Sequence, residues 1–206
     1  MVGLNANKTQ AQSINKLLIE DEALLQCIKE QAVKNHWQES QDVRTLTCHG
    51  LKISTLKGLE VFDNLTKLSL YNNKLTQVDL RHFKQLEYIN IANNKLYEIE
   101  LTDLEKLETL YLFKNNLTTI DFTGLTQLKK IRVTNNKLAS LDISPLTALE
   151  KAYLFDNKLE DLIIAGLPKL KFIELKQNPM PDDVYDRYDE LEGITIIHDG
   201  NADDWK

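Results

Sequence analysis

Few side chains of this 206-residue chain could support catalysis or metal binding, and they share no spacing. The four histidines lie in unrelated contexts: His36, His49, His82 and His198. No serine or cysteine lies in a nucleophile motif, and the seven glycines form no phosphate-binding loop. The acidic residues from Asp199 to Asp203 match only the start of a calcium loop, because its twelfth-position Glu is missing. We therefore predict no enzyme activity, no metal ion and no cofactor.

Binding chemistry is better represented, because aromatic and basic residues recur at a fixed interval. Tyr111, Arg132 and Tyr153 are 21 residues apart, and Phe113 and Phe155 are separated by twice that spacing. Residues of these types are enriched in the centres of protein interfaces. For the side chains to act together, the elements that carry them must repeat with the same period.

Leucines recur with this period through most of the chain. Those at positions 65, 86, 107, 128, 149, 170 and 191 are each followed three and five residues later by an apolar residue. The first six segments follow LxxLxLxxNxL, with Asn always ninth: Asn73, Asn94, Asn115, Asn136, Asn157 and Asn178. An atypical copy starts at Val43, and Leu191, Ile194 and Ile196 continue the register as a truncated last strand. Such a period predicts a repeat solenoid.

Each repeat position has a physical interpretation. Alternation in LxxLxL places the leucines on one side of a short strand, so that the strands stack in parallel over a dry interior. Apolar residues of the second half, such as Val78 and Leu80, close the coil from the convex side. The amide of the ninth-position Asn can satisfy buried backbone groups of its own and the neighbouring coil. We therefore interpret the six asparagines as structural.

Residues 1–42 are predicted to form a helical N-terminal cap, because solenoids must cover their open ends. From Asp21 an acidic start and apolar residues at helical spacing predict a helix that ends near Trp37. The preceding stretch with Ile14, Leu17 and Leu18 suggests another helix.

The C-terminal cap is predicted over residues 182–206, after about seven repeats in residues 43–181. The segment PDDVYDRYDELEG offers Asp182 or Asp183 as a helix N-cap and Gly193 as a stop. A closing strand at 194–197 is expected to follow, within the truncated repeat.

The two cysteines are expected to lie at one junction, with Cys27 on the cap helix and Cys48 at the inward-pointing sixth position of the first repeat. A disulfide, which implies export, and two buried thiols in a cytosolic protein are both compatible with this placement. The start MVGLNANKTQ lacks the apolar segment of an export signal, which favours a cytoplasmic protein. The alternative is a periplasmic or cell-surface protein whose export signal preceded Met1.

The repeats resemble those of the leucine-rich-repeat family, and the form LxxLxLxxNxLxxLDL is similar to the short 21-residue class common in bacteria. Asp79-Leu80 and Asp142-Ile143 carry the LDL-like element, whereas Ile163 departs from it. The N-terminal helix and the following VRTLTCHGLKISTLKGLEVFDNLTKL resemble the capped start of internalin-like proteins. The resemblance covers roughly residues 20–198. It implies an α/β right-handed solenoid with a concave parallel sheet of about eight strands, which recognises partners without catalysis.

The third, fifth and seventh positions of each repeat project from the concave face. Seven of these 21 positions are aromatic, against about one or two expected from the 7% aromatic content. We predict that Arg132 lies between the rings of Tyr111 and Tyr153, and that Phe113 and Phe155 flank Thr134. The predicted partner-binding residues are Tyr71, Tyr88, Tyr111, Phe113, Lys130, Arg132, Lys151, Tyr153, Phe155 and Phe172. The alternative is that the rings only cover one another and the sheet.

The net charge of -6 makes nucleic acid an unfavourable partner, and no apolar run approaches the length of a membrane span. We therefore predict a monomer that binds a protein with a convex or acidic surface. A glycan or another extended ligand, bound by a surface protein in adhesion or host interaction, is the alternative. Rings interleaved with lysines can also stack on sugars.

Overall fold

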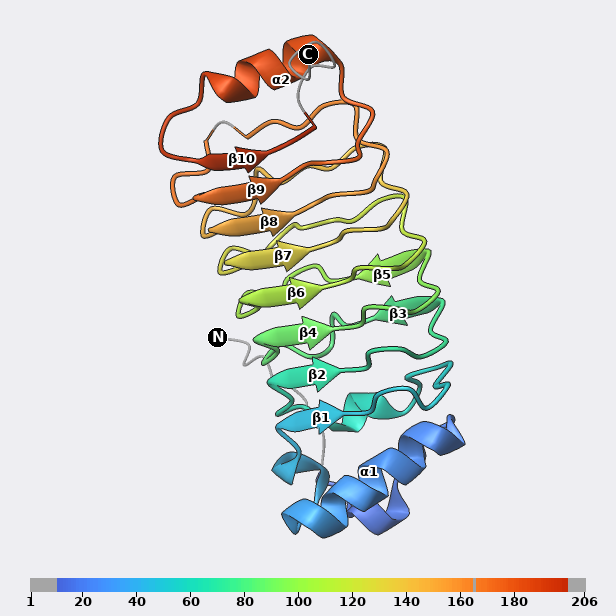
Figure 1. Ribbon diagram of the computed structural model, residues 1–206. Coiled ribbons are helices and arrows are strands. Elements are labelled where there is room, and N and C mark those ends of the chain that lie inside the picture. Colours follow the sequence, from blue (N-terminus) through green and yellow to red (C-terminus); the bar gives the residue numbers. More distant parts are fainter. Residues whose placement is uncertain (1–10, 165, 200–206) are drawn as a thin grey trace, which may run out of the picture.

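The computed structural model describes residues 11–164 and 166–199 as a coiled solenoid with a long parallel sheet on one side (Figure 1). Eight strands form this sheet in the order β1-β2-β4-β6-β7-β8-β9-β10. A second sheet pairs β3 (Gln77–Asp79) with β5 (Glu98–Glu100) on the opposite side of the coil. The strands of the long sheet are β1 (Thr45–Thr47), β2 (Lys67–Ser69), β4 (Tyr88–Asn90), β6 (Thr109–Tyr111), β7 (Lys130–Arg132), β8 (Lys151–Tyr153), β9 (Phe172–Glu174) and β10 (Thr195–Ile197).

The 21-residue period of the sequence is the register of the sheet. Arg132 on β7 pairs with Tyr111 on β6 and with Tyr153 on β8, as the spacing predicted. Side chains at equivalent positions therefore form straight columns across the strands, about 4.8 Å apart.

The last strand departs from the predicted register by two residues. Thr195 pairs with Phe172, a separation of 23 residues, and Ile196 takes the place predicted for Ile194. The helix and turn before β10 use the two additional residues. Because side chains alternate along a strand, a slip of two residues keeps Ile196 on the core side. Leu191, predicted to continue the leucine column, is instead 37% exposed.

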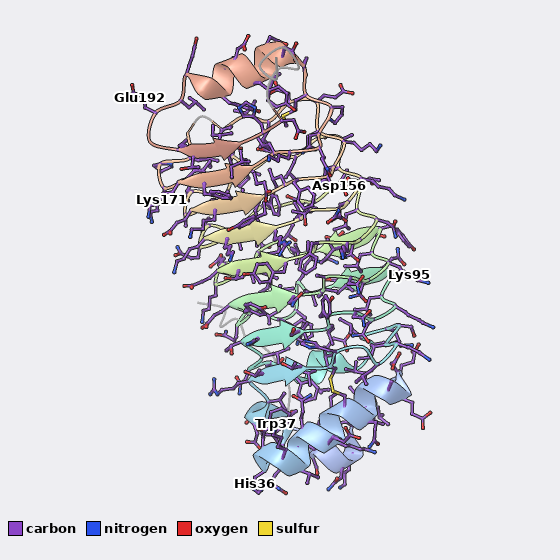
Figure 2. The ribbon with its side chains drawn as sticks, viewed as in Figure 1. His36, Trp37, Lys95, Asp156, Lys171 and Glu192 are labelled. Carbon is purple, nitrogen blue, oxygen red and sulfur yellow. A yellow bond between two sulfur atoms is a disulfide. The ribbon has the colours of Figure 1, made fainter. Side chains whose placement is uncertain are left out.

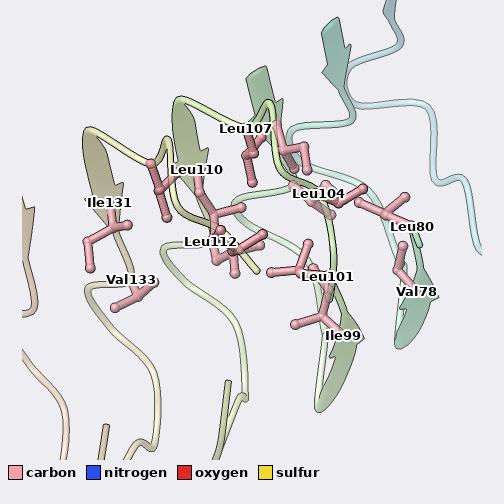
Figure 3. Close-up of a cluster of buried hydrophobic side chains, with 14 of the residues drawn as sticks. Val78, Leu80, Ile99, Leu101, Leu104, Leu107, Leu110, Leu112, Ile131 and Val133 are labelled. Carbon is pink, nitrogen blue, oxygen red and sulfur yellow. The ribbon is translucent and has the colours of Figure 1, made fainter. Parts of the chain in front are cut away.

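Leucines from every coil fill one continuous interior (Figure 3). Leu107, Leu110, Leu112 and Leu117 of a single coil are fully buried, and residues such as Leu101 close the convex side. A coil buries these side chains only against its neighbours, so the stability of the array depends on stacking.

The ninth-position asparagines connect adjacent coils. The Asn115 side chain donates to the carbonyl of Leu112 in its own coil, at 2.9 Å, and to that of Ile91 in the preceding coil, at 3.0 Å. Its Oδ1 accepts from the Leu96 amide at 3.0 Å. The other five repeat this pattern: Asn73, Asn94, Asn136, Asn157 and Asn178. Each asparagine thus satisfies backbone groups that the turn leaves without partners.

The eighth position of each coil adopts a left-handed backbone conformation, a feature not predicted from the sequence. The φ angle lies between 55° and 69° at Gly50, Asn72, Asn93, Lys114, Asn135, Asp156 and Gln177. Gly, Asn and Asp tolerate this region best, and they occupy five of the seven positions. The recurrence of these types beside the conserved-pattern Asn was the available signal.

Helix α1 (Glu22–Asn35) covers the first coil, in agreement with the predicted N-terminal helix. Asp21 is its N-cap and also accepts from the Ser54 amide at 2.8 Å. Gln31 bonds both the amide and the carbonyl of Thr47, and so satisfies backbone groups at the edge of the sheet. Cys27 and Cys48 form a disulfide between α1 and the first coil (Figure 2).

The second helix predicted before α1 was wrong. Only a 3-10 turn forms at Ile14–Lys16, and Leu18 is 89% exposed although Leu17 is buried. After this turn the chain runs extended beside Gly58, where an added Cβ would lie 2.2 Å from the Leu18 carbonyl oxygen. This close approach to a glycine replaces the helix. Two further 3-10 turns lie at Ser40–Asp42 and Leu59–Val61.

Helix α2 (Asp182–Asp189) covers the other end, but with different limits from those predicted. Pro181 is the N-cap, so Asp182 and Asp183 lie in the first turn, where their charge suits the helix dipole. The helix ends well before Gly193. Burial against the last coil raises the pKa of Tyr188 to about 12. Within the described ranges, neither helix has the length and apolar character needed to cross a bilayer.

Replacing Asn115 with Ala tests the connection between coils. Three buried backbone groups lose their partner, so we expect the free energy of unfolding to fall by about 1 to 3 kcal/mol. Urea unfolding followed by circular dichroism measures the change. Asn116→Ala is the matched control, since this neighbouring side chain makes none of the ladder bonds; equal losses in both variants would contradict the assignment.

Candidate functional site

The candidate site is the concave face, which carries the third, fifth and seventh positions of every coil. All seven aromatic side chains on this face are half-buried rather than fully exposed: Tyr71, Tyr88, Tyr111, Phe113, Tyr153, Phe155 and Phe172. Three small residues between them are covered, with exposures of 4% for Ser69, 0% for Ala92 and 1% for Thr134. The rings therefore lie over the sheet instead of standing away from it.

Rings contact one another across the columns. Tyr88 and Tyr111 meet edge to face with ring centroids 5.7 Å apart, and Tyr153 and Phe172 lie 5.2 Å apart. Each such contact contributes about 0.5 to 1.5 kcal/mol beyond area burial. The rings are thus held in place before any partner arrives.

The seventh-position column alternates large and small side chains. Tyr71, Ala92, Phe113, Thr134 and Phe155 follow one another across five coils. Residues two strands apart are separated by about 9.6 Å at the backbone, yet the ring centroids of Tyr71 and Phe113 are 6.2 Å apart. These two rings lean together over Ala92. Phe113 and Phe155 flank Thr134, as predicted.

The predicted placement of Arg132 between Tyr111 and Tyr153 was wrong. Its guanidinium lies 4.6 Å from the ring centroid of Phe113 instead. Tyr111 packs against Tyr88, and Tyr153 packs against Phe172, so both rings turn away from Arg132.

Lys130 is the cation that lies between the two tyrosines. Its Nζ is 5.4 Å from the ring centroid of Tyr111 and 5.6 Å from that of Tyr153. A hydrogen bond to Tyr111 raises the pKa of Lys130, and the charges of Tyr111 and Tyr153 act in the same direction. On β2, Lys67 lies over Tyr88 at 4.9 Å. Each contact stabilises an exposed cation by about 0.5 to 1 kcal/mol.

Positive charge on this face has no acidic partner. The concave positions carry five cations and a single carboxylate: Lys67, Lys130, Arg132, Lys151, Lys176 and Glu174. Among the residues that the structure describes, all six ion pairs lie elsewhere. Lys129, adjacent to Lys130 but at the second position, pairs with Glu108 at 2.7 Å. In a chain of net charge -6, the cations of this face remain available for a ligand.

His49 belongs to the same face, although its pattern did not single it out. Its Nε2 lies 2.7 Å from the Ser69 hydroxyl, and its ring meets Tyr71 edge to face at 5.9 Å. Burial, together with the charge of Lys67, lowers the pKa of His49. By contrast, Lys151 has no ion pair and Phe155 no ring contact within the described residues.

Neither metal binding nor the faint calcium-loop spacing gains support from the described part of the chain. It contains no group of three or more His, Cys, Asp or Glu side chains able to hold a metal ion. Asp199 accepts a hydrogen bond from the Gln177 amide, while 200–206 lie outside the described residues.

Comparisons with solved structures find internalins among the similar folds. Internalin C2 of Listeria monocytogenes is 25% identical with a TM-score of 0.61, over 93% of this chain and 98% of that one. An internalin, InlF, of the same organism is 23% identical with a TM-score of 0.60, over 93% and 67%. A leucine-rich-repeat protein of Leptospira interrogans is 24% identical with a TM-score of 0.58, over 76% and 49%. No curated protein matches.

A family model matches residues 19–136, which is more than half of the chain. The matched region starts before α1 and includes the ring cluster as far as Lys130, Arg132 and Thr134. Tyr153, Phe155 and Phe172 lie beyond it. The chain belongs to the family described as the endo-beta-N-acetylglucosaminidase EndoS leucine-rich-repeat domain.

Proposed function

We propose that this protein binds a protein partner with an acidic surface on its concave face, and that it does so without catalysis. The unpaired cations held over aromatic rings carry the proposal. Internalin-like leucine-rich-repeat proteins are typically binding modules rather than enzymes. The fold therefore agrees with recognition, and the charge of the face suggests the chemistry of the partner.

Preorganisation supports tight binding by this face. Tyr88, Tyr111, Tyr153 and Phe172 already pack in pairs, so ordering them on association costs little side-chain entropy. Lys130 and Arg132 are held over rings but keep hydrogen atoms free to donate. A partner carboxylate gains charge-assisted hydrogen bonds without breaking an ion pair of this protein.

A matched pair of double variants tests the surface. Lys130→Ala with Arg132→Ala removes two unpaired concave cations, whereas Lys129→Ala with Lys171→Ala removes two lysines that pair with Glu108 and Glu150. Both lose the same charge. We expect affinity for a protein partner captured from the native host to fall about tenfold or more only in the concave variant.

The partner affinity is measured by surface plasmon resonance at several salt concentrations, with circular dichroism as a check on folding. Binding by wild type should weaken as salt increases, because exposed charges contribute. Equal affinity of the two double variants would refute the proposed surface.

Glycan binding is the second candidate, because the family model is named for an enzyme that cleaves glycans. The half-buried rings of Tyr111 and Tyr153 offer apolar surface on which sugars stack. A glycan array separates the candidates. Binding that persists at high salt, and that is lost in Tyr111→Ala with Tyr153→Ala, would favour the glycan.

We also propose that the protein works in an oxidising compartment, either the periplasm or the cell surface. The support is the Cys27–Cys48 disulfide, which joins α1 to the first coil and contributes about 3 kcal/mol for a loop of this length. Protein freshly isolated from its native cells and denatured with an alkylating agent should stay unlabelled until it is reduced. Complete labelling without reduction would place it in a reducing compartment.

A further inference from the structure

Thr134 differs from every other small residue of the concave face, because its buried hydroxyl has no partner. Its Oγ1 makes no hydrogen bond within the described residues, and the side chain is 1% exposed. Ser69, which is also covered, has His49 as a partner at 2.7 Å. A buried hydroxyl without a partner costs about 1 to 3 kcal/mol, so its presence on a binding face requires an explanation.

The two small gaps in the seventh-position column are not equivalent. Over Ala92, the flanking rings of Tyr71 and Phe113 meet at 6.2 Å and close the gap. Over Thr134, Phe113 and Phe155 form no ring pair within the described residues, and Phe113 instead carries the Arg132 guanidinium at 4.6 Å. The second gap therefore has aromatic walls, a hydroxyl at its floor and a cation at its rim.

The electrostatic surroundings favour an anion at this place. Arg132 is exposed and has no ion pair, and Lys130 lies on the same strand. The register neighbours of Arg132 are two tyrosines. Glu174, the single acidic concave residue, lies two strands away, paired in register with Tyr153.

We infer that Phe113, Arg132, Thr134 and Phe155 form a subsite for an acidic side chain of the partner. The methylene groups of a Glu or Asp enter between the two phenylalanine rings, and the carboxylate accepts from the Arg132 guanidinium and the Thr134 hydroxyl. Access requires rotation of side chains only, since the coil backbone is held by the bonds of Asn136. The inference rests on the proposed function and names the group that the face recognises.

Acetylated hexaglutamate amide is the probe, and hexaglutamine amide is its neutral counterpart. Binding to the full chain is followed by nuclear magnetic resonance of threonine methyl groups, which reports on Thr134 directly. We expect hexaglutamate to shift the Thr134 methyl signal and hexaglutamine to leave it unchanged.

Thr134→Val removes the hydroxyl and keeps the branched shape, and Thr109→Val makes the same change at a less buried position of this face. We expect Thr134→Val to raise the thermal midpoint, because an unpartnered buried group is lost, and to weaken hexaglutamate binding about five- to tenfold. Thr109→Val should do neither. Arg132→Lys, which keeps the charge but loses the planar fork, should also weaken binding.

Two results would overturn the subsite. Hexaglutamate binding by Thr134→Val at wild-type affinity would mean that the hydroxyl takes no part, and absence of hexaglutamate binding to wild type would exclude the carboxylate. If the double variant Lys130→Ala with Arg132→Ala loses a captured partner while Thr134→Val keeps both ligands, the proposed function stands and the subsite alone fails.

Discussion

Hydrogen bonds from the ninth-position asparagines set the spacing on which the rest of the molecule depends. Each amide joins a carbonyl of its own coil to two backbone groups of the preceding one, as at Asn115. A coil of another length would place its Asn out of reach of these groups. Equal coils give straight columns, and straight columns bring residues 21 positions apart into contact. The binding face is therefore a consequence of how the turns are closed.

Much of the fold could be predicted from the sequence, because the repeat is a one-dimensional signal with a direct physical meaning. Leucine alternation placed the strands, and helical spacing after Asp21 placed α1. The ends were less predictable. The slip before β10 and the start of α2 at Asp182 depend on how the terminal segments pack, and no repetition reports that packing.

The candidate site was predictable in its columns but not in its contacts. Register alone put Arg132 beside Tyr111 and Tyr153, whereas the rotamers of those rings decided that Lys130, not Arg132, lies between them. Rotamers depend on the next residues outward, such as Tyr88 and Phe172, and pairwise spacing does not include them. The missing partner of the Thr134 hydroxyl is a property of three dimensions only.

The two-residue slip before β10 also limits how this array can grow. A duplicated 21-residue unit between β2 and β9 would add one strand and leave every column aligned. A unit copied across the junction from Phe172 to Thr195 would span 23 residues, and it would shift each later coil against the asparagine spacing. Lengthening by gene duplication is thus permitted inside the solenoid and penalised at its C-terminal end, so its reach can evolve while the caps stay unchanged.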